Sequence, residues 1–373
     1  MSALSGTLFV VALERLGLVG LPNSGKSALF NALTGAQVVV APHPFSTTET
    51  QVGSASVPDA RLDQLSTMSS SKKTVYSTVE MVDIAALVAG ASAGEGLGNR
   101  FLAQIREVDA ICYVLRTFEN PQIVGTTNPI EALAELELEL VIADADSLQN
   151  QLDRRKRAAK SDKSLDKEIA YYERALKVLS EGTPLYRCRD DKELDFALLK
   201  GLFLLTAKPS VAIVNISEDQ IGDESLAQQS KEIGKMLGSD SEAIMVCVQL
   251  ESEASQLDPE ARKEVLEGLG LGEGVLPRVA RETLSAVGRE TFFTTGDKES
   301  RAWTYRKGAK APECAGVIHS DLQRGFIRAE VIHWDELIEI GSWSKAKTVG
   351  KLRVEGKDYQ VVDGDVLEIR FNV

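Results

Sequence analysis

The chain of 373 residues is long enough for about two or three domains at roughly 150 residues each. Its hydrophobic fraction of 43% and charged fraction of 26% are ordinary for a water-soluble globular protein. A formal net charge of -13 argues against a protein that binds nucleic acid by overall electrostatic attraction. DNA is therefore not an expected partner, and only a local basic patch could contact RNA.

The sequence shows no mark of a membrane protein or of a disulfide-rich secreted protein. No apolar run approaches the roughly 18 residues that a membrane span needs, and the apolar stretch at residues 8–13 lacks the basic start of a signal peptide. The scattered cysteines, which contain no C-x-x-C pair, are Cys112, Cys188, Cys247 and Cys314. We therefore expect a cytoplasmic protein with reduced, buried thiols and no membrane partner.

From Leu16 onward, short strand patterns alternate with helical patterns, which is typical of a parallel α/β sheet. The expected order is a strand (LGLVG), a glycine loop, a helix (KSALFNALTG), a strand (TVEMVDIAA), and then strands at 109–115, 211–214 and 243–248.

The segment between Pro129 and about Leu205 differs from this pattern, because it is rich in Ala, Glu, Leu, Lys and Arg and poor in Gly. Apolar residues spaced four, three, four and three apart indicate a helix that packs on another helix; they are Leu165, Ile169, Tyr172, Leu176 and Leu179. We predict a coiled-coil-like helical hairpin at residues 130–205, inserted into an α/β domain of residues 15–288.

A basic run, DRRKRAAKSDK, occupies Asp153 to Lys163 at the expected tip of this hairpin. Such runs usually mark only a solvated helix end. In an acidic protein, however, a basic tip could contact RNA phosphates while the rest of the protein is repelled by them.

After Gly288 the pattern becomes β-rich. The stretch ETFFTTGDKESRAWTYRKG predicts two strands around a Gly-Asp turn, a short helix is expected at 315–322, and further strands end with a turn at Asp363-Gly364. We predict a separate domain at residues 289–373, in which Trp303 and Tyr305 either pack in the core or stack on bases.

The motif GLPNSGKS, Gly20 to Ser27, fits G-x-x-x-x-G-K-[ST] between a strand and a helix. Glycines let several backbone N–H groups point into one cavity, as a phosphate chain requires. Lys26 would bind the β- and γ-phosphates and the Ser27 hydroxyl would bind Mg²⁺. The alternative is a glycine-rich turn with a surface lysine, which the strand and helix context disfavours.

Because Mg²⁺ prefers several oxygen ligands, we expect other residues to bind the ion together with Ser27. The loop HPFSTTET offers Thr47 or Thr48, and Asp83 stands at a strand end before a glycine-rich run that suits a mobile switch. A polar surface loop without a ligand remains the alternative for the threonines.

The stretch SVAIVNISED places Asn215 and Glu218 at the end of a predicted strand. Nucleotide-binding α/β proteins recognise the nucleobase at such strand ends. GTPases commonly have Asn-Lys-x-Asp there, whereas this chain has Asn-Ile-Ser-Glu. A carboxylate at Glu218 would still suit the N1–H and 2-amino donors of guanine, so the quartet alone leaves adenine and guanine open.

Taken together, these motifs resemble the Obg-like ATPase family of the YchF type from Leu16 to Val373. The resemblance is carried by GLVGLPNSGKSALFNALTG, HPFSTTETQVG, DIAALVAGASAGEGLGNRFL, IREVDAI, FEN, NISE, FFTTGDKESRAWTYRKGAKAPECAGVIHSDLQRGFIRAEV and EGKDYQVVDGDVLEIRFNV. It implies an α/β fold with a Ras-like P-loop NTPase domain, an inserted coiled-coil arm and a C-terminal β-grasp (TGS) domain. It also implies Mg²⁺-dependent hydrolysis of ATP, preferred over GTP, by a ribosome-associated switch in translation or stress response, with the ribosome and ribosomal RNA as partners.

The resemblance assigns site residues position by position. The implied nucleotide contacts are Asn23, Ser24, Gly25, Lys26, Ser27, Ala28, Asn215, Ile216, Glu218 and Val248; the implied Mg²⁺ ligands are Ser27, Thr47 and, through water, Asp83. Lys26 would stabilise phosphate charge, and Asn23 is a candidate K⁺ ligand whose other interpretation is a loop-stabilising hydrogen bond. No catalytic base is assigned.

Some positions depart from the patterns of related families. Ala86 replaces the second-switch glycine, and Leu87 occupies the place of the glutamine that orients water in many GTPases. The loop after FEN lacks the histidine of relatives, and Cys247-Val248-Gln249 replaces Ser-Ala-Lys. Two alternatives therefore remain open: a GTPase of the same switch class, and a hydrolysis-poor, nucleotide-gated ribosome-binding module.

Overall fold

The computed structural model describes residues 15–36, 50–84, 97–119, 125–238, 243–268, 274 and 276–372. The chain divides into two compact units. The larger unit contains residues 14–55 and 80–286, and the smaller unit joins Ser56–Val79 to Val287–Val373.

The larger unit is built on a six-stranded sheet in the order β2-β4-β1-β5-β6-β7. The strands are β1 (Arg15–Val19), β2 (Gln51–Val57), β4 (Ser77–Asp83), β5 (Ala110–Arg116), β6 (Ser210–Asn215) and β7 (Ile244–Val246). The pairs β1 with β4, β1 with β5, β5 with β6, and β6 with β7 are all parallel, which confirms the predicted sheet. Because parallel strands end at one edge, the loops after β1, β4, β5 and β6 meet there.

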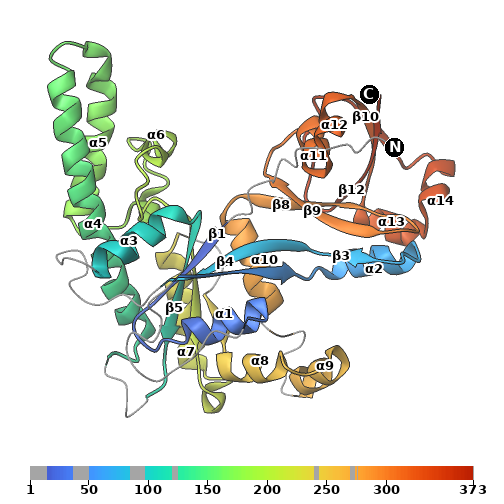
Figure 1. Ribbon diagram of the computed structural model, residues 1–373, viewed down its shortest axis with the longest axis horizontal. Helices are drawn as coiled ribbons and strands as arrows, with labels where there is room; N and C mark the ends of the chain where they lie inside the picture. Colours follow the sequence, from blue (N-terminus) through green and yellow to red (C-terminus); the bar gives the residue numbers. More distant parts are fainter. Residues whose placement is uncertain are drawn as a thin grey trace, which may run out of the picture. The chain divides into compact units, whose positions relative to one another are not determined.

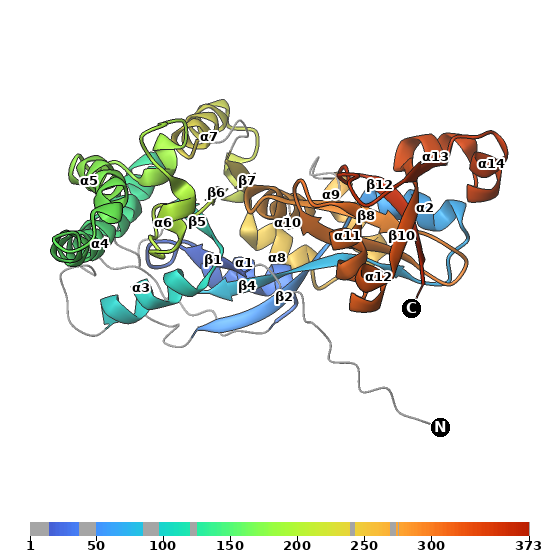
Figure 2. The same ribbon diagram turned by 90° about the horizontal axis from the view of Figure 1, so that it is seen from above.

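Helices cover both faces of this sheet, as Figure 2 shows, with α3 and α4 on one side of the strands and α1, α8 and α10 on the other. The helices are α1 (Lys26–Thr34), α3 (Leu97–Glu107), α4 (Pro129–Ala158), α5 (Asp166–Ser180), α6 (Phe196–Lys200), α7 (Glu224–Met236), α8 (Val248–Ala254), α9 (Pro259–Gly268) and α10 (Leu276–Ala286). Residue 248, predicted to end a strand, instead begins α8.

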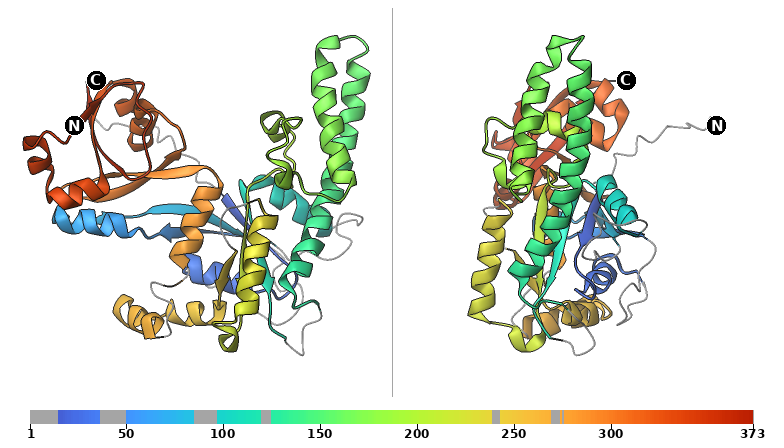
Figure 3. Two further views of the ribbon diagram at one scale, coloured as in Figure 1. Left: turned by 180° about the vertical axis from the view of Figure 1, so that it is seen from behind. Right: turned by 90° about the vertical axis from the view of Figure 1, so that its left-hand side faces the viewer.

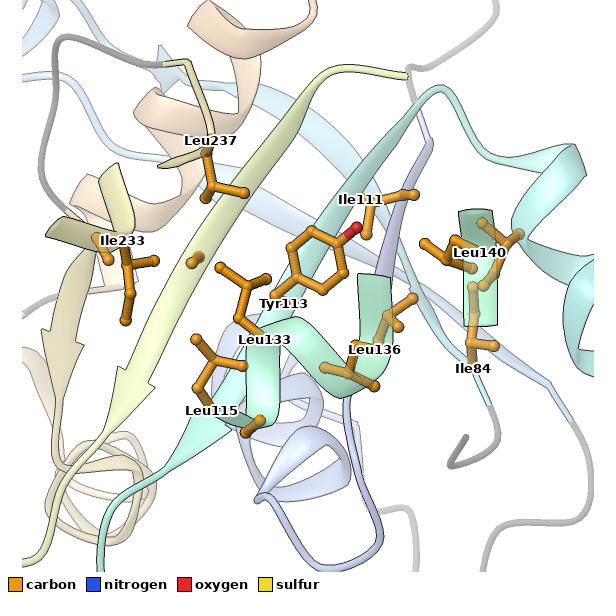
Figure 4. Close-up of a cluster of buried hydrophobic side chains, with 14 of the residues drawn as sticks. Ile84, Ile111, Tyr113, Leu115, Leu133, Leu136, Leu140, Ile233 and Leu237 are labelled. Carbon is orange, nitrogen blue, oxygen red and sulfur yellow. The ribbon is translucent and has the colours of Figure 1, made fainter. Parts of the chain in front are cut away.

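A core of mainly apolar side chains lies between the sheet and helices α3, α4 and α7 (Figure 4). Tyr113 and Leu115 of β5 contact this core together with Leu133 and Leu136 of α4. Each of these four side chains is fully buried. The core therefore fixes β5 and the start of the arm against the strands that carry the site.

The predicted helical arm is formed by α4 and α5, which lie side by side in Figures 1 and 3. The packed stripe includes Leu148 and Leu152 of α4 with Tyr172 and Leu179 of α5. The basic run covers the end of α4 and the turn that precedes the 3-10 helix η1 (Lys163–Leu165). The structure thus places that run at the tip of the hairpin.

One buried carboxylate ties α4 to the segment that enters β6. Asp144 is fully buried and accepts hydrogen bonds from Leu205 N (2.9 Å), Thr206 N (2.7 Å) and Thr206 Oγ1 (2.7 Å). Burial raises the pKa of Asp144, and these hydrogen bonds oppose the rise. Since β6 begins at Ser210, the arm is anchored four residues before a strand of the site.

The smaller unit has its own six-stranded sheet, in the order β11-β10-β12-β8-β9-β3. Its elements are α2 (Ala60–Met68), β3 (Thr74–Val75), β8 (Arg289–Thr294), β9 (Ser300–Arg306), α11 (Ala311–Ile318), α12 (Ser320–Arg324), β10 (Phe326–His333), α13 (Trp334–Ile340), α14 (Trp343–Thr348), β11 (Arg353–Glu355) and β12 (Asp365–Phe371). The expected turn at residues 363–364 is present, and Gly364 has φ 91°. Two helices, α11 and α12, occupy the region where one was expected.

The smaller unit recruits a segment from between β2 and β4, which the sequence did not predict. Strand β3 pairs in parallel with β9, and Leu62 and Leu65 of α2 pack with Phe293 in one apolar cluster. Arg61 donates hydrogen bonds to Asp59 and to Asp363, the latter at 2.6 Å. The predicted boundaries 15–288 and 289–373 stay predictions, but the compact unit around the C-terminal sheet includes residues 56–79.

Two further observations concern the class of protein. Among the helices in the described part of the chain, none is both long and apolar enough to span a membrane. All four cysteines carry free thiols, of which Cys112, Cys247 and Cys314 are buried and Cys188 is partly buried.

Candidate functional site

The loop between β1 and α1 has the backbone shape of a phosphate cradle. Gly25 adopts φ 97° and Asn23 φ 58°, a left-handed region that asparagine tolerates better than most residues. A Cβ atom on Gly25 would lie 2.3 Å from Asn215 Nδ2, and one on Gly20 would lie 2.5 Å from the backbone oxygen of Val114. Close packing therefore requires both glycines, and the positive φ of the turn also favours glycine at position 25.

Lys26 is the first residue of α1, and its side chain folds back over the loop. Its Nζ donates hydrogen bonds to the carbonyl oxygens of Gly20 (3.1 Å) and Leu21 (3.2 Å). Burial lowers the pKa of Lys26 to about 8, and the Asp83 carboxylate opposes that shift. The ammonium group of Lys26 is therefore held against the backbone of the loop.

The predicted Mg²⁺ ligands Ser27 and Asp83 meet although they are 56 positions apart in the sequence. The Ser27 hydroxyl donates a hydrogen bond to Asp83 Oδ2 at 2.6 Å. Asp83 is fully buried at the end of β4, and its Oδ1 has no hydrogen-bond partner among the described residues. Burial raises the pKa of this carboxyl, while the bond from Ser27 and the charge of Lys26 oppose the rise.

This pair fits a hard divalent cation. A buried carboxylate oxygen without a donor is costly unless a cation or an ordered water satisfies it. A hydroxyl and a carboxylate beside a phosphate loop are the oxygen ligands that Mg²⁺ prefers, with waters completing its shell. Ser27 would bind the ion directly and Asp83 would hold one of its waters.

Asn215 joins the loop to β6 and α8. It is buried at the end of β6, donates from Nδ2 to the carbonyl oxygen of Ser24 (2.9 Å) and accepts at Oδ1 from Val248 N (3.2 Å). This single side chain therefore connects the phosphate loop, β6 and the start of α8. The structure brings together three of the segments that the sequence analysis assigned to the nucleotide.

A cavity of about 400 Å³ opens beside these residues. Its lining residues come from the loop and α1 (Gly25, Ala28, Asn31), from the end of β6 and the segments after β5 and β6 (Phe118, Asn215, Ile216, Ser217), and from α8 with the residue before it (Cys247, Val248, Gln249, Ser252, Glu253). Phe118 was not predicted, although its position two residues after β5 could have indicated it, because strand ends meet at this edge. An aromatic ring and an apolar wall suit a planar base.

Glu218 does not line the cavity, in contrast to Asn215 and Ile216. It is exposed and forms the first residue of the short 3-10 helix η3 (Glu218–Gln220). The carboxylate that would suit guanine in the sequence is therefore not part of the cavity wall.

Several predicted positions lie outside the residues that the structure describes. These positions are Thr47 and Thr48, Ala86 and Leu87, and the loop at residues 120–124. Their assigned roles stay predictions.

Comparison with protein families gives two matches. Residues 290–372 match the family model YchF-GTPase_C, described as "Protein of unknown function (DUF933)". Residues 15–169 match the model described as "50S ribosome-binding GTPase".

Individual relatives match nearly the whole chain. The "Ribosome-binding ATPase YchF" of Bacillus subtilis (strain 168) is 44% identical over 364 residues, which cover 96% of this chain and 99% of that protein. The protein of the same name from Pasteurella multocida is 45% identical over 363 residues, with the same coverage. The solved structure of the Schizosaccharomyces pombe YchF GTPase superposes with a TM-score of 0.80 at 32% identity, covering 96% of this chain and 97% of that one.

Proposed function

The chain belongs to the YchF family, and from this membership and the geometry of its site we propose that it is a Mg²⁺-dependent ATPase. It binds and hydrolyses ATP in preference to GTP and acts in the cytoplasm as a ribosome-associated, nucleotide-dependent switch. The names of its relatives, which describe ribosome-binding ATPases, support both parts of the proposal.

One observation carries the proposal: a buried lysine, a serine–aspartate pair and a base-sized cavity meet around a single loop. Lys26 and the N-terminus of α1 supply positive charge for the triphosphate. Ser27 and Asp83 supply the oxygen ligands at one end, and Asn215 fixes the base cavity at the other.

The residues of the chain act mainly by position and charge. On binding of the triphosphate, Lys26 Nζ exchanges its two carbonyl partners for phosphate oxygens and stabilises the charge that develops during transfer. A bound Mg²⁺ would supply further neutralisation of the β- and γ-phosphate oxygens. Since Leu87 cannot orient a water molecule, we expect slow intrinsic turnover that depends on backbone groups, a cation or a partner.

The lining of the cavity supports the proposed preference for adenine. Asn215 and Ile216 line it, but the Glu218 carboxylate, which would accept the two donors of guanine, does not. Phe118 provides an aromatic surface that suits either purine. In proteins with an aspartate at this position, its carboxylate contacts guanine and favours GTP. Glu218 does not supply that contact, because it does not line the cavity.

Turnover of labelled ATP and GTP tests the proposal directly, with the Lys26→Ala variant as the baseline. We expect phosphate release from ATP above that baseline, and a lower kcat/KM for GTP. Faster turnover of GTP would instead identify a GTPase of the same class. Release no higher than the baseline for both nucleotides would refute the enzyme proposal and leave a nucleotide-gated binding module.

We further propose that Asn23 contributes a ligand to a K⁺ ion beside the phosphates. We expect turnover in K⁺ to exceed turnover in Na⁺ by roughly tenfold, because an added cation there would stabilise transition-state charge. The Asn23→Ala variant should show a much smaller difference, measured by phosphate release at constant ionic strength. Equal rates of the unmodified protein in the two salts would contradict this role.

The arm tip provides the test of the ribosome proposal. Arg154, Arg155 and Arg157 lie in the last turns of α4, in an otherwise acidic protein. Replacing all three by alanine should weaken co-sedimentation with ribosomes by roughly tenfold and lower its salt dependence, because phosphate contacts release counterions. The matched control replaces Arg278 and Arg328, which are exposed elsewhere. Unchanged binding of the triple variant would show that the tip is only a solvated helix end.

A further inference from the structure

We propose that Gln220 is a positioning residue that sets the selectivity of the base cavity for adenine over guanine. The inference rests on the proposed nucleotide-binding function and goes beyond it, because neither the sequence motifs nor the cavity lining includes this residue. Gln220 lies behind the cavity, at the end of η3.

The side chain of Gln220 joins the two loops that form one wall of the cavity. Its Oε1 accepts hydrogen bonds from Ser217 N (3.0 Å) and from Thr117 Oγ1 (2.7 Å), and its Nε2 donates to the Thr117 carbonyl oxygen (3.3 Å). Thr117 directly precedes Phe118, and Ser217 directly follows Ile216. One amide group therefore fixes the aromatic wall relative to the apolar wall.

The same residues are also linked through their backbones. Thr117 N donates to the Asn215 carbonyl oxygen at 3.1 Å, and the Thr117 hydroxyl lies 3.2 Å from that oxygen. Thr117 is buried, so a loss of its amide partner would leave polar groups unsatisfied and the two loops less tightly joined. Gln220 thus adds side-chain hydrogen bonds to the backbone bond that already holds Thr117 beside Asn215.

Gln220 also fixes where Glu218 points. Ser217 and Gln220 form a reciprocal capping box, in which each side chain accepts a hydrogen bond from the backbone of the other. This box closes the 3-10 turn, in which Glu218 is exposed and absent from the cavity lining. When the turn is opened, the Glu218 carboxylate gains the freedom to approach a guanine, whose N1–H and 2-amino groups it can accept.

The test compares the Gln220→Ala variant with the unmodified protein by calorimetric titration with ATP, GTP and inorganic tripolyphosphate. We expect the affinity for ATP to fall by roughly tenfold, because the loosened cavity wall must be ordered when the base binds. The affinity for GTP should fall less, so the ratio of the two dissociation constants shifts towards GTP. Binding of tripolyphosphate, which lacks a base, should not change.

Two variants separate positioning from a general structural effect. Gln220→Glu keeps a side-chain acceptor for Ser217 and Thr117, and glutamate is favoured in capping boxes, so it should retain most of the selectivity. Gln228→Ala, at an exposed glutamine of α7, should behave like the unmodified protein.

The outcomes are distinguishable. An equal loss of ATP and GTP affinity, a parallel loss of tripolyphosphate binding, or no change at all would each overturn the role of Gln220. Absence of ATP binding by the unmodified protein would instead refute the proposed function. A shift of the nucleotide ratio with unchanged tripolyphosphate binding and recovery in Gln220→Glu would support the inference.

Discussion

Replacing Lys26 with alanine is expected to reduce ATP turnover by at least about 100-fold, the usual cost of removing one preorganised group that stabilises transition-state charge. Lys26 is buried at the start of α1, and its Nζ is held within 3.2 Å of two loop carbonyl oxygens. The measurement is phosphate release under single-turnover conditions, so that slow product release does not hide the effect.

The matched control for this prediction is Lys235→Ala, because Lys235 is an exposed lysine of α7 in the same unit. It should leave turnover within about twofold of the unmodified protein. If Lys26→Ala retained turnover comparable with the control, the phosphate-binding role of the loop would be wrong.

Replacing Asp144 with alanine is expected to destabilise the larger unit by about 3 kcal/mol or more. Three donors, the backbone N–H groups of Leu205 and Thr206 and the Thr206 hydroxyl, lose a buried acceptor together. Denaturant unfolding followed by far-ultraviolet circular dichroism measures the loss, and hydrogen exchange at residues 204–207 should become faster.

Asp146→Ala provides the control, since Asp146 is exposed on the same helix two residues later. It should change stability by no more than about 0.5 kcal/mol, as is usual for surface substitutions. Equal effects of the two substitutions would mean that the anchor of the arm lies elsewhere.

The features that could be predicted from the sequence are those determined by residues close together in the chain. The loop Gly20–Ser27 follows a fixed pattern of glycines, and its steric basis is visible at Gly25, where a Cβ would collide with Asn215. The heptad-like spacing of Tyr172 and Leu179 required a partner helix, which α4 supplies. In both cases the local spacing was enough to predict the feature, because residues close together on one loop or one helix determine it.

The sequence did not predict features that depend on contacts between distant segments. Strand β3 has two residues and pairs with β9, more than 200 positions later, so no local pattern marks it. Glu218 lies in a turn that is closed by the side chain of Gln220, which also bonds to Thr117 from the segment after β5. The quartet Asn-Ile-Ser-Glu alone therefore could not show that Glu218 lies outside the lining of the cavity.

The recruitment of residues 56–79 into the smaller unit has a consequence for biosynthesis. Helix α2 leaves the ribosome early, but Phe293 and β9, which cover its apolar residues Leu62 and Leu65, are made near the end of the chain. During translation the apolar face of this helix therefore stays exposed until the last segments of the chain are synthesised. The smaller unit cannot complete its fold before that point. For the same reason, a single cut in the chain cannot release either unit intact.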